Sequence, residues 1–248
     1  MILAADDPVA VAATEAVQRG DLDTLRRMLD ERPGLATAFI GDPGGMSRTL
    51  LHAATDWPGH YPDNAATVAV LIDAGADVNA RFTGPHTETP LHWAASSDDV
   101  EVLDVLLDAG ANIEAPGAVI AGGTPLSDAV AFAQWKTARR LVERGARTPL
   151  REAAALGLLD RVEASCAADP SPSPDDLTQA LWYAAHGGQP DVAAFLIERG
   201  ADVNWIASWD GTTPLDAAAR NETSGTVDWL RARGGRTAEE LTSGRTKE

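Results

Sequence analysis

The sequence is poor in cysteine, in basic residues and in long apolar runs, and each shortage excludes a class of protein. Cys166 is the only cysteine in 248 residues, which excludes a disulfide framework and a cysteine-based metal site. Acidic residues outnumber Lys and Arg by 37 to 20, and the resulting net charge of −17 makes nucleic acid and anionic membranes poor partners. No apolar run approaches the ~20 residues of a membrane span.

The first residues also lack the features of a secretory leader. Residues 1–14 contain Asp6 and Asp7 and no basic residue, which argues against a signal peptide and predicts a cytoplasmic protein. The chain is rich in Ala and Arg and has few Lys, which suggests a bacterial, GC-rich genome.

What the chain does contain is a fixed spacing in which a leucine is followed nineteen residues later by a glycine. Leu91–Gly110, Leu126–Gly145, Leu181–Gly200 and Leu215–Gly234 all show it. Self-similarity at a fixed period indicates a repeat array, whose members stack on their neighbours. Such arrays usually act through a long surface.

The clearest repeat shows what fills this spacing. Thr89 can cap a helix that begins at Pro90. A proline is tolerated in the first turn because the backbone N–H that it lacks would have no partner within the helix there. Apolar residues then recur at helical spacing over residues 100–107, and Gly110 suits the left-handed position after that second helix. One repeat is therefore predicted to be helix, turn, helix and a connecting finger.

These sequence motifs resemble those of the ankyrin repeat family. The matching segments are residues 89–95 (TPLHWAA), 123–126, 148–150 and 213–215, with repeat closings at 73–80 and 198–204. The resemblance covers roughly residues 10–236 and implies an all-α ankyrin-repeat solenoid of about seven helix-turn-helix repeats with short β-like fingers. We assign residues 1–236 to the array, with the first and fifth repeats degenerate, and 237–248 to a polar C-terminal tail that we expect to be frayed.

Three deviations from the spacing are candidates for function. Leu51–Gly75 is five residues longer than the other repeats, and the extra residues 58–62 form a Pro-rich loop that either carries binding groups or folds back over the stack. Between Gly145 and Leu150 the finger is essentially absent, which predicts a notch in the row of fingers. Residues 169–176 form a stiff, Pro-rich linker with a structural role.

Aromatic side chains recur at positions that we expect to be exposed. The resemblance implies that the first helices and the fingers line a concave side on which partners bind. Trp and Tyr on such a surface are typical anchors of binding hot spots. The binding residues predicted in this way are Asp56, Trp57, Tyr61, Phe82, Trp93, Phe132, Tyr183, His186, Trp205 and Trp209.

The sequence offers little catalytic chemistry. His52 and His92 occupy the motif position that, in the family, hydrogen-bonds to neighbouring loops. If the protein is an enzyme, His60, His86 and His186 are the acid–base candidates, with Asp56 and Asp210 as carboxylate partners. No metal-site, nucleotide-binding or triad motif is present, so we predict no metal site, no cofactor and otherwise no catalytic residue.

Two functional hypotheses follow. The first is a binding module that captures a protein or peptide, with a basic partner favoured, in an acidic, Trp-rich concave groove. The alternative is a small-molecule-binding protein or enzyme with a His/Asp site in the concave surface near residues 56–62. Aromatics that converge on an enclosed cavity would favour the second hypothesis, and a row of rings along a groove would favour the first.

Overall fold

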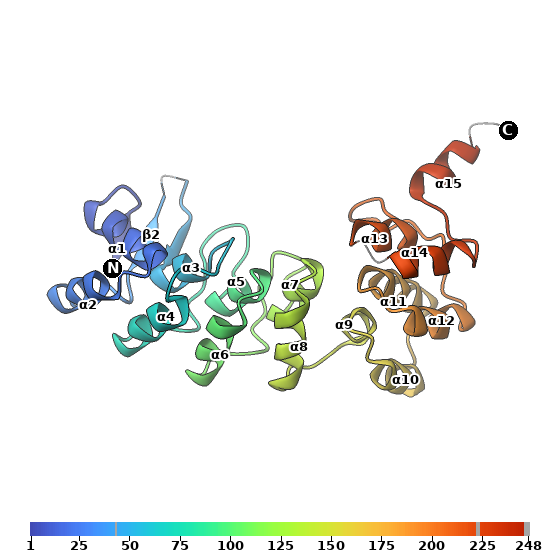
Figure 1. Ribbon diagram of the computed structural model, residues 1–248, viewed down its shortest axis with the longest axis horizontal. Coiled ribbons are helices and arrows are strands. Elements are labelled where there is room, and N and C mark those ends of the chain that lie inside the picture. Colours follow the sequence, from blue (N-terminus) through green and yellow to red (C-terminus); the bar gives the residue numbers. More distant parts are fainter. Residues whose placement is uncertain (43, 222–223, 246–248) are drawn as a thin grey trace. The chain divides into compact units, whose positions relative to one another are not determined.

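The computed structural model of the protein describes residues 1–42, 44–221 and 224–245 (Figure 1). The chain divides into two compact parts, unit 1 (Met1–Ala146) and unit 2 (Arg147–Glu248). The division falls between Gly145 and Leu150, where the sequence predicts that a finger is missing.

Unit 1 contains four helix pairs and three short strands within its described residues. The helix pairs are α1 (Pro8–Arg19) with α2 (Leu22–Glu31), α3 (Leu50–Thr55) with α4 (Asn64–Asp73), α5 (Pro90–Ser96) with α6 (Val100–Asp108), and α7 (Pro125–Ala131) with α8 (Trp135–Glu143). The first helices pack side by side in the order α1, α3, α5, α7, and α2, α4, α6, α8 form a second layer beside them.

Unit 2 contains three further helix pairs and one additional helix in the part that the structure describes. These are α9 (Leu150–Ala155) with α10 (Leu159–Ala167), α11 (Pro174–His186) with α12 (Pro190–Glu198), α13 (Pro214–Arg220) with α14 (Ser224–Arg231), and α15 (Ala238–Arg245). The seven helix pairs agree with the predicted number of repeats.

The C-terminal tail differs from its prediction. Residues 238–245 form α15, whereas we expected the whole of 237–248 to be frayed; residues 246–248 lie outside the described part. The helix begins where Glu240 accepts a hydrogen bond from the Thr237 backbone N–H, and Ala238 donates its N–H to Asp216 of α13. These caps satisfy backbone groups that a frayed end would leave to water.

The leucines and glycines of the nineteen-residue spacing have structural roles. Leu91, Leu126, Leu181 and Leu215 are fully buried in the first helices of their repeats. The paired glycines all have positive φ, between 85° and 96°, which a side chain rarely tolerates. The spacing therefore measures one repeat from its core leucine to the turn that ends its second helix.

The Thr-Pro-Leu-His motif caps the first helix of its repeat and joins that helix to the following finger. His92 Nδ1 accepts the Thr89 backbone N–H at 3.1 Å, and its Nε2 lies 3.4 Å from the Gly123 carbonyl of the following finger. His52 makes the same contacts with Thr49 and Glu88. Burial lowers the pKa of both imidazoles to about 4, so they are neutral, structural histidines, as predicted.

The first fingers of unit 1 form a small three-stranded sheet, whereas the sequence predicted only short β-like fingers. β1 (Ile2–Ala4) runs parallel to β2 (Phe39–Gly41), which is antiparallel to β3 (Ser47–Thr49). An isolated bridge from Ser47 to Thr83 joins the next finger to this sheet. The sheet therefore gives the first fingers of unit 1 a shared backbone support.

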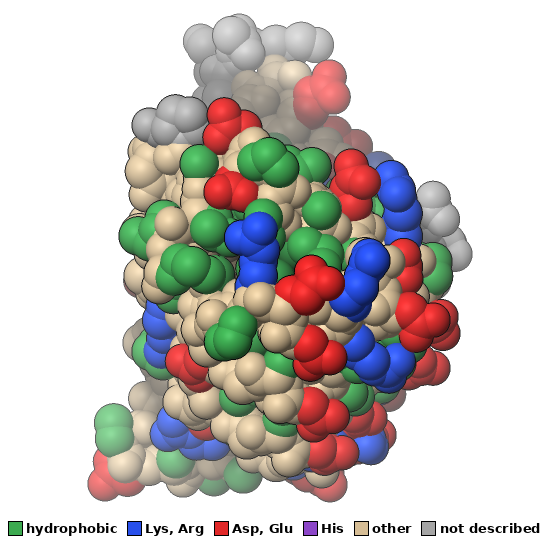
Figure 2. All heavy atoms as spheres, turned by 90° about the vertical axis from the view of Figure 1, so that its left-hand side faces the viewer, with side chains coloured by type: hydrophobic (Ala, Val, Ile, Leu, Met, Phe, Trp, Pro, Cys, Tyr) green, Lys and Arg blue, Asp and Glu red, His purple; other side chains and the backbone are tan. Residues whose placement is uncertain are grey.

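The end of unit 1 formed by α1 and α2 has a mixed surface. Figure 2 shows hydrophobic side chains gathered in the upper part of this face, with acidic and basic side chains around and below them. Ile2 and Val11 are among the exposed apolar residues of this region. Within residues 1–42, 44–221 and 224–245, no helix is both long and apolar enough to cross a bilayer.

Candidate functional site

The candidate residues lie in three separate places, which we name by their position. The turn pocket lies between the helix–helix turns of unit 1. The finger hollow lies among the fingers and first helices of unit 1. The ring cluster, in unit 2, consists of Trp182, Tyr183, His186, Trp205 and Trp209.

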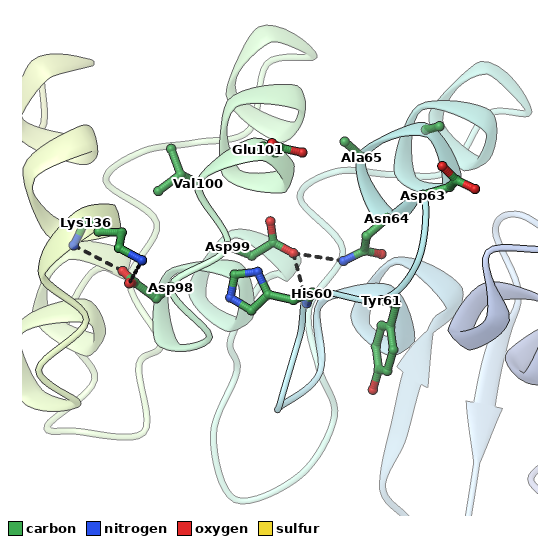
Figure 3. A pocket seen from close by; sticks show the side chains of 11 residues that line it. His60, Tyr61, Asp63, Asn64, Ala65, Asp98, Asp99, Val100, Glu101 and Lys136 are labelled. Atoms are coloured by element: carbon green, nitrogen blue, oxygen red, sulfur yellow. Dashed lines mark hydrogen bonds and ion pairs between the residues drawn. The ribbon is translucent and has the colours of Figure 1, made fainter.

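The inserted loop of the second repeat forms one wall of the turn pocket, a hollow of about 590 Å³ (Figure 3). The backbone N–H of His60 donates to Asp99 Oδ2 at 3.3 Å, and the side chain of Asn64 donates to the same oxygen at 2.9 Å. His60 Nε2 lies 3.0 Å from the Ser97 carbonyl oxygen. These contacts fasten the loop to the turn between α5 and α6.

The other side of the loop packs on the first repeat. A Cβ atom on Gly20 would lie 2.2 Å from the Pro62 carbonyl oxygen, so the two turns are in close contact. Tyr61 is half-buried, and burial raises the pKa of its hydroxyl while a hydrogen bond with Gln18 opposes that rise. The loop therefore fills the space between neighbouring turns, which favours the packing alternative over a binding arm.

The acidic groups of the turn pocket are also used to hold adjacent turns together. Asp98 Oδ1 accepts the backbone N–H of Lys136 at 3.1 Å (Figure 3). It also accepts the backbone N–H of Thr137 at 3.0 Å. Asp99 Oδ1 accepts the Val102 N–H and caps α6. The carboxylates of Asp98 and Asp99 in this pocket are therefore used in structural hydrogen bonds.

The finger hollow has an aromatic wall. It has a volume of about 560 Å³ and is lined by Val11, Thr14 and Glu15 of α1, by residues of the β2–β3 hairpin, and by Phe82, His86 and Trp93. Phe82 stacks on His86 with ring centroids 4.6 Å apart, and its centroid is 5.6 Å from that of Trp93. The three rings are therefore one contiguous wall and not isolated exposed side chains.

A buried carboxylate, Glu88, lies at the edge of this wall. Glu88 Oε2 accepts the Trp93 indole N–H at 2.7 Å and lies 2.9 Å from His86 Nδ1. Glu88 Oε1 accepts the backbone N–H of Val119 at 2.9 Å, from the next finger. Because a charge-assisted bond is stronger and more directional than a neutral one, Glu88 fixes the orientation of the Trp93 ring, whereas His86 Nδ1 lies close to Glu88 without a hydrogen bond of normal geometry.

Asp128 of α7 lies beside Glu88 and is fully buried. Neither of its oxygens accepts a well-formed hydrogen bond from the described residues. Burial, together with the neighbouring Glu88 carboxylate, raises the pKa of Asp128 to about 9. The two observations agree, since a neutral Asp128 is itself a donor and can share its proton with Glu88.

The ring cluster joins α11 to the finger before α13. Trp182 lies within 5.3 Å of the centroids of both Tyr183 and Trp209, and Trp205 lies 5.3 Å from Trp209. Trp182 is buried, whereas Trp209 is 48% exposed. The cluster therefore has a buried base and an exposed ring on top.

Hydrogen bonds hold the finger of the ring cluster in place. The Trp182 indole N–H donates to Thr212 Oγ1 at 3.1 Å, and that hydroxyl donates to Asp210 Oδ1 at 2.7 Å. Asp210 Oδ2 pairs with Arg220 at 3.0 Å. Asp210 thus organises the finger that carries Trp205 and Trp209.

Several predicted site residues have other surroundings. His186 is buried, stacks on Trp182 and lies 2.8 Å from Asn221 Nδ2, so it is part of the packing and not of an exposed surface. Asp56 is paired with Arg48. Trp57 and Phe132 are 76% and 45% exposed and lie outside the ring contacts described above.

The acid–base candidates belong to different sites. His60 lines the turn pocket and His86 the finger hollow, while His186 belongs to unit 2. Within the described part of the chain, no three His, Cys, Asp or Glu side chains are grouped as a metal site would require.

The comparisons with known proteins identify the family. The profile described as "Ankyrin repeats (3 copies)" matches residues 13–117, 63–152 and 147–238, so the chain belongs to the ankyrin repeat family. An ankyrin repeat and KH domain-containing protein of Caenorhabditis briggsae is 31% identical over 174 residues, which cover 65% of this chain but 6% of that protein.

A solved structure supports the fold. The ankyrin repeat domain of human ASB11 superposes with a TM-score of 0.54 at 22% identity and covers 93% of this chain and 99% of that one. At this identity the likeness concerns the fold alone.

Two features of these sites escaped prediction from the sequence. Trp182 is not among the predicted binding residues, because its position at the base of the ring cluster depends on a finger 30 residues away. The Glu88–Asp128 pair joins different repeats and has no sequence motif. The one available signal was that Asp128 occupies the repeat position that Trp93 and Tyr183 occupy elsewhere.

Proposed function

We propose that the chain is a protein-binding module that captures a basic peptide segment on the ring cluster of unit 2. Ankyrin repeats are generally protein–protein interaction modules, which supports the class of function. The observation that carries the choice of surface is Trp209, a nearly half-exposed indole that packs against Trp182, Tyr183 and Trp205.

The rigidity of this indole favours binding. A large ring that is already held by its neighbours loses little conformational freedom when a partner covers it. Exposed Trp and Tyr side chains of this kind are the usual hot spots of interfaces. The net charge of −17 would accelerate the approach of a basic partner, and that contribution should weaken with added salt.

The test begins with a peptide selected from a random display library on the immobilised full chain. Its affinity for wild type and for Trp209→Ala is then measured by fluorescence anisotropy. We expect a loss of at least about tenfold in affinity, the size of a hot-spot contribution. Trp57→Ala removes a more exposed indole from unit 1 and is the matched control, with an expected change below about twofold.

Selected peptides that bind Trp209→Ala as tightly as wild type would contradict the choice of surface. A failure to select any peptide would count against the module itself. The acid–base alternative near residues 56–62 has less support, because the His60 backbone N–H and Nε2 both lie against the α5–α6 turn.

A further inference from the structure

The finger hollow is a second concave feature, in unit 1, and it shares no residue with the ring cluster. Its volume of about 560 Å³ lies within the ~300–1,000 Å³ of ordinary small-molecule sites. Val11, Ile40 and Met46 line it from α1 and the hairpin, and Phe82 and Trp93 line it from the aromatic wall. These walls suit a flat or apolar molecular body.

The aromatic wall also suits a positive charge. The faces of aromatic rings carry partial negative charge and attract ammonium groups, most strongly on tryptophan. Glu88 adds a carboxylate whose Oε2 lies 2.7 Å from the Trp93 indole nitrogen and 2.9 Å from His86 Nδ1, at the edges of both rings. The wall is therefore apolar at its surface and negative in its field.

The remaining charges around the hollow have the same overall sign. Arg48 is the cationic side chain among the lining residues, and Asp56 neutralises it. Asp42 also lines the hollow, and no described Lys or Arg pairs with it. Glu15 is in turn neutralised by Arg19. A cation that enters the hollow thus gains attraction from Asp42 and the field of Glu88, and an anion is repelled by both.

A hydrogen-bonding group completes the wall. His86 lines the hollow, and its Nδ1 lies 2.9 Å from Glu88 Oε2 without making a hydrogen bond of normal geometry. A neutral imidazole has one ring nitrogen that accepts hydrogen bonds. An ammonium N–H is the matching donor.

From this arrangement we propose that the finger hollow binds a small organic cation, an amine carried on a flat apolar body. The body lies against Phe82 and Trp93, and the ammonium group is recognised by Asp42 and His86. The site is independent of the peptide surface on unit 2.

The test uses three ligands of one shape and different charge. Isothermal titration calorimetry on the full chain compares 2-(1-naphthyl)ethylamine, 2-(1-naphthyl)ethanol and 3-(1-naphthyl)propionate. We expect the amine to bind about tenfold more tightly than the alcohol, and the carboxylate to bind most weakly. Equal affinities, or an amine that does not bind at 1 mM ligand, near the weak limit of specific binding, would overturn the proposal.

A matched pair of variants tests the location. Val11 and Ala12 are neighbouring exposed residues of α1, but Val11 alone of the two lines the hollow. Val11→Trp should abolish amine binding by filling the hollow, and Ala12→Trp should leave it unchanged, with circular dichroism confirming that both fold. Amine binding that survives Val11→Trp would place the ligand elsewhere and refute the assignment.

Further variants separate charge from shape. Asp42→Asn keeps the side-chain acceptor that receives the Met46 N–H at 3.0 Å, so the hairpin is retained. It should weaken the amine about threefold, an exposed-charge effect, and leave the alcohol unchanged. A parallel loss for both ligands would refute the charge argument. Trp209→Ala should bind the amine normally, whatever its effect on peptides.

Discussion

At the scale of single residues, the buried pair formed by Glu88 and Asp128 has the largest energetic consequence. Two carboxyl groups that face each other in a dry interior cannot both be charged at low cost. Glu88 accepts from Trp93 and Val119, so it is the member that is stabilised as an anion. Asp128 retains the proton, and its pKa rises to about 9.

This pair predicts a stability that falls as pH rises. The unfolded chain releases the Asp128 proton near pH 4, whereas the folded chain keeps it up to about pH 9, so folding binds a proton between these limits. Asp128→Asn should therefore stabilise the protein by on the order of 1–3 kcal/mol at pH 9, because it removes an acid that resists ionisation. Its advantage should shrink toward pH 4.

Urea denaturation of wild type and Asp128→Asn at pH 7 and pH 9 checks this prediction. Between pH 7 and pH 9 the folded protein does not titrate at His52 or His92, because burial lowers the pKa of both to about 4. Asp23→Asn, which changes a fully exposed carboxylate, is the control. A free-energy difference between wild type and Asp128→Asn that does not grow with pH would show that Asp128 is ionised in the folded state.

At the scale of secondary-structure elements, close packing between first helices decides which turns tolerate a side chain. Gly187 ends α11, and a Cβ there would lie 1.8 Å from the Ala155 carbonyl oxygen at the end of α9. Backbone cannot move away as a flexible side chain can. Gly225 of α14, by contrast, has no neighbouring atom within 4 Å of the same position.

Gly187→Ala should therefore destabilise unit 2 by about 1–3 kcal/mol through overpacking. Gly225→Ala should leave stability unchanged or raise it by up to ~1 kcal/mol, because alanine is the better helix former. Thermal unfolding followed by circular dichroism gives both values. Loss of stability in Gly225→Ala with none in Gly187→Ala would contradict the packing argument.

The same scale shows what the sequence could and could not predict. The helices were predictable because Thr caps, first-turn prolines and buried leucines are local signals repeated in register. The role of residues 58–62 was not, because it depends on Asp99 and Gly20 of the neighbouring repeats. β1 was also missed, since a three-residue strand has no periodicity and exists only through its pairing with β2.

For the sites, too, local features were predictable from the sequence and contacts between repeats were not. The sequence predicted aromatic side chains in the fingers and first helices, and Phe82, Trp93, Tyr183, Trp205 and Trp209 lie there. It could not predict that they divide into a hollow in unit 1 and a cluster in unit 2. That division depends on ring-to-ring packing between repeats, which the spacing of residues along the chain does not encode.

At the scale of the whole molecule, the dominant property is the net charge of −17. Local ion pairs exist, such as Arg140 and Arg144 with Asp104 and Asp108 along α6 and α8. Each such partly exposed pair contributes only about 0–1 kcal/mol, and salt weakens it. The excess of acidic over basic side chains instead acts throughout the chain and disfavours the compact state.

The balance between these effects predicts the response to salt. The Debye length is about 30 Å at 10 mM ionic strength and about 10 Å at 100 mM, so added salt weakens long-range repulsion more than it weakens ion pairs in contact. The Tm should therefore rise by a few degrees between 10 and 300 mM NaCl, equivalent to about 1 kcal/mol for a chain of this size. Differential scanning calorimetry measures it, and KCl should act like NaCl because screening depends on ionic strength alone. A Tm that falls with either salt would mean that the ion pairs, and not the excess negative charge, dominate the electrostatics of folding.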